Sequence, residues 1–194
     1  MTRIDSETGM DAGWVLPVAV CESLCDGLTR ATSPAEALAR IEAARHALWG
    51  PGLLTVNLVV ARPAEAGGVF LLQRAWTSHP DQYPVGGGKR KVATAWTEQL
   101  LVRGELFVGE GEAALAAVFD DAARIAGLGL RSVINVPLLQ AGECRATLNV
   151  LGPQPGWSAQ QIAVVRLLAL LAQPFVLQLS PARAGALQRR ATAS

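Results

Sequence analysis

The spacing of apolar residues changes several times along the chain, between the 3.6-residue period of helices and the two-residue alternation of strands. Helical patterns predict helices at residues 14–29, 33–48, 94–102 and 158–179, and one helix or two over residues 112–126. Short β-branched runs predict strands at residues 53–62, 69–76, 105–108, 131–139 and 143–151. Tight turns join two pairs of these strands, so we expect antiparallel hairpins with helices packed on the sheet, an α+β (α/β) fold.

Start and stop signals support these boundaries. Ser33-Pro34-Ala35-Glu36 and Ser158-Ala-Gln-Gln161 are capping boxes, in which side chains bond the free backbone N–H groups at a helix start. Gly50-Pro51-Gly52 is typical of the end of the second helix. The element order is therefore helix–helix–hairpin–loop–helices–hairpin–helix.

A long irregular segment, residues 77–91, follows the first hairpin. Its sequence is Thr-Ser-His-Pro-Asp-Gln-Tyr-Pro-Val-Gly-Gly-Gly-Lys-Arg-Lys, which is dense in hydrogen-bonding groups. Irregular segments of this length inside compact domains are usually functional or disordered. The segment is therefore the first place to look for a site.

Polar residues also interrupt the apolar strands, at Arg74, Asn135 and Asn149. Each of them must be hydrogen-bonded if it is buried, and the alternative is that it faces solvent. In the second hairpin, alternation places Val133, Asn135 and Pro137 on one face of the sheet.

The final helix is apolar nearly all round. Residues 162–179 reach about the minimum length of a membrane span, but Arg166, Gln173 and Pro174 interrupt them. We interpret this segment as a helix of a soluble protein, and we expect no membrane partner. Such a helix must be covered on more than one side, which favours a homodimer.

Length and composition narrow the class of protein. With 194 residues and a mass of 20.4 kDa, one domain is expected at residues 13–180, between a flexible N-terminus at 1–12 and a flexible tail at 181–194. Hydrophobic residues form 51% of the chain, which argues against disorder. The formal net charge is only +1, so we expect no nucleic-acid partner.

The cysteines indicate a reducing compartment. Cys21, Cys25 and Cys144 are an odd number, and the first residues lack the apolar core of a signal peptide. We therefore expect free thiols and a cytoplasmic location. Cys21 and Cys25 share one helix face and are expected to be small packing residues, with a redox or metal pair as the alternative. We expect neither a metal nor a cofactor.

Two glycine-rich stretches fail as nucleotide-binding motifs. In Gly86-Gly-Gly-Lys-Arg-Lys91, Tyr83 stands where a P-loop needs its first glycine, and Arg90 stands where it needs Ser or Thr. The acidic residues in and after Gly109-Glu-Gly111 would repel a pyrophosphate. The chain also contains no Gly-x-Ser-x-Gly elbow and no His-Glu-x-x-His motif. None of these enzyme classes is therefore expected.

Four features offer titratable or charged groups. His46 ends its helix, where an imidazole can meet free carbonyls. His79 lies in the irregular segment, either as a pH-sensitive group or satisfied by local bonds. Lys89–Lys91 is either a solvated loop end or the source of a cation that turns inward onto a carboxylate or phosphate. In Phe119-Asp-Asp121, one aspartate can cap the next helix, while Asp120 is the candidate acceptor or base in a pocket.

The second hairpin and the segments before it resemble a GAF domain over about residues 34–178. The resemblance rests on Leu130-Arg-Ser-Val-Ile-Asn-Val-Pro-Leu-Leu139 and Ala146-Thr-Leu-Asn-Val-Leu151. A subset of stand-alone bacterial GAF proteins is also similar in Arg74-Ala-Trp-Thr-Ser-His-Pro80, Tyr83-Pro-Val-Gly-Gly-Gly-Lys89, Trp96 and Phe119-Asp-Asp121. The resemblance implies a central antiparallel sheet of five or six strands, with helices on one face and a loop-covered small-molecule pocket on the other. It also implies terminal helices that pack between two subunits.

Carried over residue by residue, the resemblance implies a pocket of aromatic and polar side chains. These are Arg74, Trp76, Ser78, His79, Tyr83, Lys89, Trp96, Asp120 and Ser132. The chain departs from several specialised subfamilies. Cys144-Arg145 is not the Cys-His pair that holds a bilin. The cysteines do not match those of methionine-sulfoxide-reducing GAF enzymes, and the cyclic-nucleotide signature is not evident.

Two functions remain. The first is a cytoplasmic sensor that binds a polar or aromatic metabolite under residues 77–91 and passes the signal to a separate partner. The second is a small enzyme of hydrolase or isomerase type in the same pocket. In that enzyme His79 or Asp120 acts as acid or base, and a Lys or Arg neutralises an oxyanion.

Overall fold

The computed structural model describes residues 15–65 and 67–179 of the chain. Trp14 and the two predicted flexible ends, residues 1–12 and 181–194, lie outside this part. The helices are α1 (Val18–Arg30), α2 (Pro34–Trp49), α3 (Ala95–Thr97), the π-helical turn η1 (Glu98–Val102), α4 (Gly111–Val118), α5 (Ala122–Gly127) and α6 (Ala159–Val176). The strands are β1 (Leu53–Ala61), β2 (Phe70–Thr77), β3 (Gly88–Lys91), β4 (Phe107–Glu110), β5 (Ser132–Gln140) and β6 (Glu143–Gly152). Each predicted helix and strand is present, with its ends displaced by a few residues at most.

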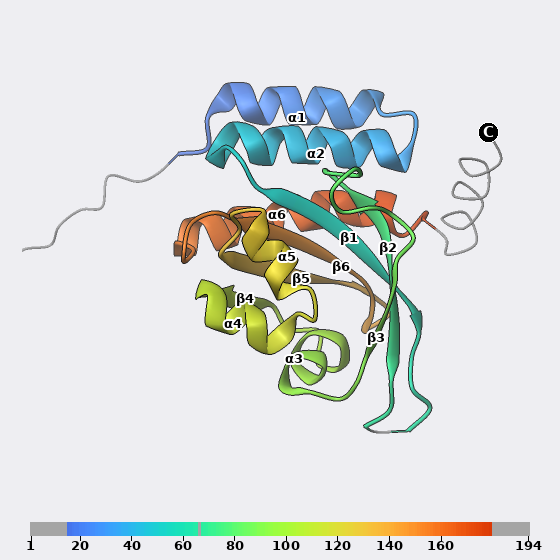
Figure 1. Cartoon of the computed structure of the whole chain (residues 1–194). Coiled ribbons are helices and arrows are strands. Elements are labelled where there is room, and N and C mark those ends of the chain that lie inside the picture. Colours follow the sequence, from blue (N-terminus) through green and yellow to red (C-terminus); the bar gives the residue numbers. More distant parts are fainter. Residues whose placement is uncertain (1–14, 66, 180–194) are drawn as a thin grey trace, which may run out of the picture.

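The strands form one six-stranded sheet in the order β3-β2-β1-β6-β5-β4, and all neighbours are antiparallel (Figure 1). The two predicted hairpins, β1–β2 and β5–β6, are confirmed, and the β1–β6 pairing joins them. The prediction that residues 77–91 are irregular throughout is wrong for Gly88–Lys91. These residues pair with β2 as an edge strand.

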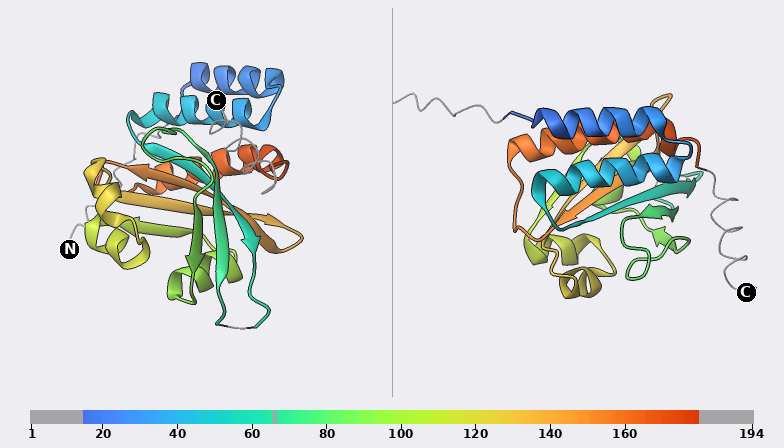
Figure 2. Two further views of the ribbon diagram at one scale, coloured as in Figure 1. Left: turned by 45° about the vertical axis from the view of Figure 1, so that its right-hand side comes forward. Right: turned by 90° about the horizontal axis from the view of Figure 1, so that it is seen from above.

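The main hydrophobic core lies between the sheet and the helices α1, α2 and α6 (Figure 2). Alternate strand residues such as Leu54 and Leu148 meet Leu38 of α2 and Leu168 of α6, and each is at most 3% exposed. Burying one such side chain contributes about 2 kcal/mol. Helices α2 and α6 are thereby fixed on this face, while α1 packs mainly against α2.

The short elements α3, η1, α4 and α5 cover the opposite face, as the view from above also shows (Figure 2). Two smaller apolar clusters hold them there. Leu115 and Ile125 pack with Val133 on one side, and Leu100 of η1 packs with Leu72 on the other. These clusters flank the middle of the sheet, where the residues are polar.

Helix α6 has the length and apolar composition of a membrane span, with a third of its residues buried in the domain. Its buried residues are Val164, Val165, Leu168, Ala169, Ala172 and Val176. The core helix of a water-soluble domain has the same composition, so these two properties alone do not identify a span. Leu167, Leu170 and Leu171 of α6 remain exposed.

A buried arginine fixes the passage from α2 into β1. Arg45 is 2% exposed. Its Nε and Nη2 donate to the two carboxylate oxygens of Glu42 at 2.6 and 2.7 Å, and its Nη1 donates to the carbonyl of Gly50 at 3.1 Å. A Cβ at Gly52 would lie 2.7 Å from the carbonyl oxygen of Leu151 and 2.8 Å from Nη1 of Arg45. Only glycine therefore fits at this point of the chain.

Candidate functional site

The middle of the sheet is polar on the face toward α3–α5. Strand alternation places Thr55 and Asn57 of β1, Asn135 of β5, and Thr147 and Asn149 of β6 on this face. The predicted grouping of Val133, Asn135 and Pro137 on one face is confirmed by packing. Val133 belongs to the apolar cluster of α4 and α5, whereas its neighbour Ile134 belongs to the core under α2 and α6. We call Thr55, Asn57, Asn135, Thr147 and Asn149 the polar floor.

A chain of hydrogen bonds joins part of the polar floor to Trp96. The indole Nε1 of Trp96 donates to Oδ1 of Asn135 at 3.0 Å, and Nδ2 of Asn135 donates to Oδ1 of Asn149 at 2.7 Å. Nδ2 of Asn149 in turn donates to Oγ1 of Thr55 at 3.2 Å. Buried polar groups stay folded only when they are paired in this way. The network therefore holds Trp96 in one orientation over the sheet.

Arg74 reaches this face from β2. Its side chain is 7% exposed, and its guanidinium carbon lies 3.8 Å from the centre of the Tyr83 ring. Nη1 donates to the carbonyl of Pro84 at 2.9 Å, while the buried Nε has no hydrogen-bond partner among the described residues. Burial lowers the pKa of Arg74, because a buried charge loses its hydration. Arg74 is thus a buried cation that no carboxylate contacts directly in the described part of the chain.

Tyr83, Lys89 and Asp121 form the centre of the site. Asp121 accepts a hydrogen bond from the Tyr83 hydroxyl and another from Nζ of Lys89 at 2.7 Å. Burial raises the pKa of Asp121, but the bonds from Lys89 and Tyr83 outweigh it and leave the pKa below its usual range. Burial, and then the bond to Asp121, raise the pKa of Tyr83. The phenol therefore remains a neutral donor to an ionised carboxylate.

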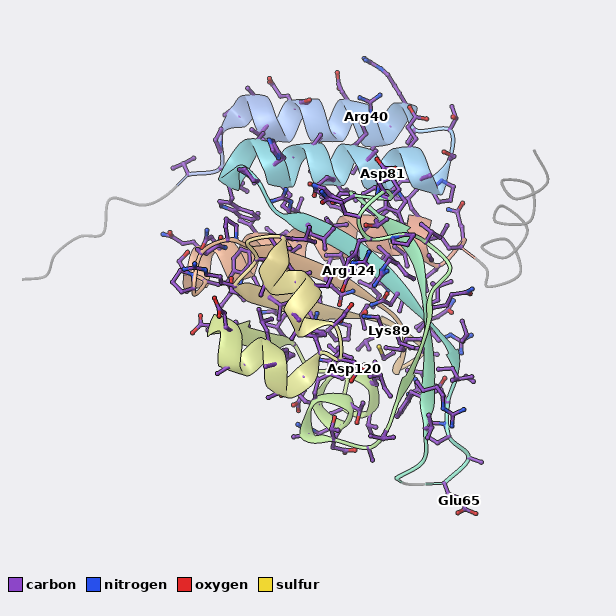
Figure 3. The ribbon with its side chains drawn as sticks, viewed as in Figure 1. Arg40, Glu65, Asp81, Lys89, Asp120 and Arg124 are labelled. Carbon is purple, nitrogen blue, oxygen red and sulfur yellow. The ribbon has the colours of Figure 1, made fainter. Side chains whose placement is uncertain are left out.

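Strand alternation in β3 explains how two lysines turn inward. Lys89 and Lys91 point to this face, and Arg90 between them is exposed. Nζ of Lys91 donates to Oδ2 of Asp120 at 2.7 Å and lies 5.9 Å from the centre of the Trp96 ring. Lys89, Asp120 and Arg124 all appear on the side of the sheet away from α1 and α2 (Figure 3). Of the two readings open for this cationic run, the inward one is correct for both lysines.

The two adjacent aspartates differ in burial. The Asp120 side chain is 78% exposed and meets Lys91 at the rim, whereas the Asp121 side chain is 24% exposed. Asp121 stands at the N-cap position of α5 but makes no capping bond with its side chain. The aspartate that faces inward is therefore Asp121, and the expectation that singled out Asp120 for the interior is corrected.

Ser78 and His79 lie to one side of this cluster. His79 is exposed, and its Nδ1 is 2.8 Å from Oγ of Ser78, which also accepts a bond from the backbone N–H of Leu54 at 3.1 Å. His79 lines an open cleft of about 340 Å³. The other residues of this cleft are Pro51, Gly52, Leu53, Gln82, Gly127, Leu128, Leu130 and Pro153.

Two predicted pocket residues lie on the face of the sheet that α2 and α6 cover, opposite to the site. Ser132 shares the face of Ile134, toward α2 and α6, and lies opposite to Val133. Trp76 also packs against the core on that face. A β-bulge is the reason, since Val56 pairs with Trp76 but Asn57 pairs with Arg74, which leaves Ala75 as an extra residue. Arg74 and Trp76 therefore do not share a face, although they are two residues apart.

Of the predicted residues, the structure brings together Arg74, Tyr83, Lys89 and Trp96. The residues that the sequence reasoning did not assign to the site are Thr55, Asn57, Lys91, Asp121, Arg124, Asn135, Thr147 and Asn149. Arg124 lies 5.8 Å from the Tyr83 ring centre, and the buried Oγ1 of Thr147 has no partner among the described residues. The strand alternation that places Asn135 on this face also places Thr147 and Asn149 of β6 there, because they pair with Pro137 and Asn135. This alternation was the sequence signal that could have identified them.

The structure shows neither a metal cluster nor a reactive buried thiol in the region it describes. No group of three or more His, Cys, Asp or Glu residues within residues 15–65 and 67–179 is placed to hold a metal ion. All three cysteines are free. Burial raises the pKa of the Cys144 thiol to about 11, so this thiol stays protonated.

The comparisons with known proteins agree with this architecture. The family model of the GAF domain matches residues 31–173, which is most of the chain. The chain belongs to the GAF domain family. The family resemblance inferred from the second hairpin is thereby confirmed, and no curated protein in the comparison matches significantly. GAF domains are commonly ligand-binding domains of signalling proteins.

Solved GAF structures show the same fold at low sequence identity. The GAF domain of a phosphoenolpyruvate-protein phosphotransferase from Coxiella burnetii is 13% identical, with a TM-score of 0.60 over 88% of this chain and 96% of that chain. The corresponding Acinetobacter domain is 14% identical, with a TM-score of 0.57 over 91% and 99%. A bacteriophytochrome from R. palustris is 12% identical, with a TM-score of 0.60 over 97% of this chain and 45% of that chain. At these identities the likeness establishes the fold and leaves the ligand open.

Proposed function

We propose that this GAF domain is a cytoplasmic small-molecule sensor, and that its ligand binds over the polar floor, beneath the segment 77–91. The observation that carries the proposal is a set of buried polar atoms without partners on this face. Arg74 Nε, Asp121 Oδ1 and Thr147 Oγ1 are all buried, and none has a hydrogen-bond partner among the described residues. Leaving such a group unpaired costs about 1–3 kcal/mol. A ligand that supplies the missing partners would recover this energy.

The surroundings of these atoms also favour a ligand site. Tyr83 and Trp96 supply aromatic surface, and Leu53 and Val133 supply aliphatic surface beside them. Small-molecule sites typically combine apolar walls with a few aimed polar groups. The open cleft at Leu53 and His79 borders this apolar cluster, because Leu53 and Leu130 belong to both.

An enzyme that uses His79 or Asp120 as its acid or base has less support. Such a side chain must lie within reach of the substrate that the polar floor would hold. His79 contacts its neighbour Ser78 and lines the open cleft, while Asp120 meets Lys91 at the rim. The two residues share no hydrogen-bond partner in the part of the chain that the structure describes. Binding without turnover is therefore the better explanation of this face.

A metabolite screen tests the proposed function. The purified chain is heated with fractions of a cell extract, and compounds that stabilise it are identified by mass spectrometry. We expect a compound that stabilises the wild type and the Arg90→Gln control, whose altered side chain is exposed on β3, but not Arg74→Gln. No stabilising compound, or equal stabilisation of Arg74→Gln, would overturn the proposal.

We also propose that two copies associate through α1 and α6. A groove of about 250 Å³ between these helices is lined by apolar and cysteine side chains only. Leu167, Leu170 and Leu171, which all line this groove, are exposed at 50%, 64% and 43%. Contiguous exposed apolar patches of this kind mark interaction surfaces. Light scattering should report twice 20.4 kDa for the wild type. Leu170→Glu should give the monomer, and Val102→Glu, an exposed position on η1, should not. A wild-type monomer at micromolar concentration would contradict the proposal.

A further inference from the structure

Tyr83 occupies a position between the open cleft and the polar floor. Its ring belongs to the same apolar cluster as Leu53 and Leu130, which line the cleft. The other side of the ring covers the Arg74 guanidinium at 3.8 Å, and its hydroxyl donates to Asp121. Tyr83 therefore packs with residues that line the cleft on one side and covers Arg74 on the other.

The charges around Tyr83 are only partly balanced. Lys89 pairs with Asp121, and Lys91 pairs with Asp120. Arg74 has no such partner in the described region, although it is 7% exposed. Its close neighbours of opposite polarity are the carbonyl oxygen of Pro84 and the π-face of Tyr83. Each of them stabilises a cation less than the full charge of a carboxylate does. Arg124, whose guanidinium carbon lies 5.8 Å from the centre of the same ring, is exposed and therefore hydrated. Among the described residues around Tyr83, Arg74 is thus the buried cation that lacks a negative partner.

We propose that Tyr83 is a placeholder for the ligand, and that the ligand is a small aromatic carboxylate. This inference rests on the proposed function, because it names the ligand class of the same site. The ligand's ring takes the place of the Tyr83 ring against Leu53 and Val133. Its carboxylate accepts hydrogen bonds from Arg74, including the unpartnered Nε. The segment that carries Tyr83 moves outward to admit it.

The size and charge of the site favour an aromatic carboxylate over other classes of small ligand. The place now holds a flat six-membered ring in contact with aliphatic side chains, so a ring of similar size fits it. One unbalanced guanidinium is matched by one carboxylate, and Nε with a terminal nitrogen offers the paired donors that a carboxylate accepts. A phosphate would bring a second negative charge close to Asp121, which is already ionised.

A panel of simple probes tests the ligand class. Titration calorimetry is run with benzoate, 4-hydroxybenzoate, phenylacetate and indole-3-acetate. The matched controls are 4-hydroxybenzyl alcohol, acetate and phenyl phosphate, which change the charge or the ring separately. We expect at least one aromatic carboxylate to bind at least about tenfold more tightly than each control, the fold-change expected from one charged hydrogen bond. Equal binding of the neutral alcohol or of phenyl phosphate would overturn the assignment.

Variants test the two residues. Arg74→Gln should lose at least about tenfold in affinity for the bound carboxylate, and Arg90→Gln should not change it. Tyr83→Ala should bind more tightly than the wild type, because the competing side chain is gone. Tyr83→Phe, which keeps the ring but loses the bond to Asp121, should also gain affinity, and it covers the case in which Tyr83→Ala misfolds. Weaker binding in a folded Tyr83 variant would refute the placeholder.

Tyr83 is the sole tyrosine of the chain, so its movement can be followed directly. Protein labelled with 3-fluorotyrosine gives one fluorine NMR signal. Addition of the carboxylate should move this signal toward its position in the unfolded chain, and an unmoved signal with bound ligand would contradict the inference. If the four carboxylates fail while an extract compound binds through Arg74, the inference falls and the proposed function stands. If nothing binds, both fall.

Discussion

Replacement of Asp121 by asparagine should destabilise the protein more than the same change at its neighbour Asp120. Asp121 accepts hydrogen bonds from the Tyr83 hydroxyl and from Lys89 and is 24% exposed. Asp120 meets Lys91 with a side chain that is 78% exposed. Solvent screens the second pair much more than the first.

The size of the effect follows from these contacts. Hydrogen bonds to a charged group contribute about 1.5–3 kcal/mol each. Partial exposure and the cost of burying the carboxylate reduce this sum, and asparagine still accepts one bond. We therefore expect Asp121→Asn to lower the free energy of unfolding by about 2 kcal/mol, or the melting temperature by about 4–8 °C for a chain of this size. Asp120→Asn should have a clearly smaller effect.

The pH dependence of the free energy of unfolding tests the same prediction independently. The folded pKa of Asp121 lies below its ordinary value of 3.8. Its contribution to stability is therefore fully present at neutral pH and is lost as the pH falls through the folded pKa. Urea unfolding, followed by tryptophan fluorescence from pH 7 to pH 2.5, measures this. The gap between wild type and Asp121→Asn should narrow as the pH falls below 3.8. An equal or larger effect of Asp120→Asn at pH 7, or a gap that widens in acid, would refute the reasoning.

Two further predictions concern groups outside the site. In the Leu170→Glu variant, which we expect to be monomeric, iodoacetamide should modify the exposed Cys25 and spare Cys144, whose buried thiol stays protonated. Mass spectrometry of both peptides measures the labelling, and equal labelling would contradict the prediction. Glu42→Gln leaves the buried Arg45 guanidinium without its counter-charge, so it should lower the free energy of unfolding in urea by about 3 kcal/mol. The control Glu143→Gln changes an exposed side chain and should lower it little. Similar losses in the two variants would contradict this prediction.

The sequence predicts most of the fold because periodicity and capping act locally. Both predicted serine caps are present, with Ser33 accepting from the backbone N–H of Glu36 and Ser158 from that of Gln161. The reciprocal bond that completes a capping box forms at Gln161, whereas the Glu36 carboxylate accepts from Thr32 instead. Strand β3 was missed for a physical reason. Its sequence Gly-Lys-Arg-Lys has no apolar alternation, and the strand exists because its backbone pairs with β2.

The site residues were harder to predict because they depend on which face a side chain takes. The bulge at Ala75 reverses the face between Arg74 and Trp76, and no residue in the segment signals it. The choice between Asp120 and Asp121 depends on the turn between α4 and α5, which tertiary contacts set. Arg74 could be identified from the sequence because a charged residue in an apolar strand must be paired or hydrated, whichever face it takes.

The indole N–H signal of Trp96 tests most directly whether the face toward α3–α5 is the ligand site. Trp96 donates to Asn135 on that face, whereas Trp76 and Trp157 pack in the core on the other face. In protein labelled with ¹⁵N-tryptophan and assigned with Trp96→Phe, any compound that stabilises the chain should shift the Trp96 indole signal and leave those of Trp76 and Trp157 in place. A stabilising compound that shifts the Trp76 or Trp157 signal and leaves the Trp96 signal unmoved would place the ligand elsewhere and contradict the account.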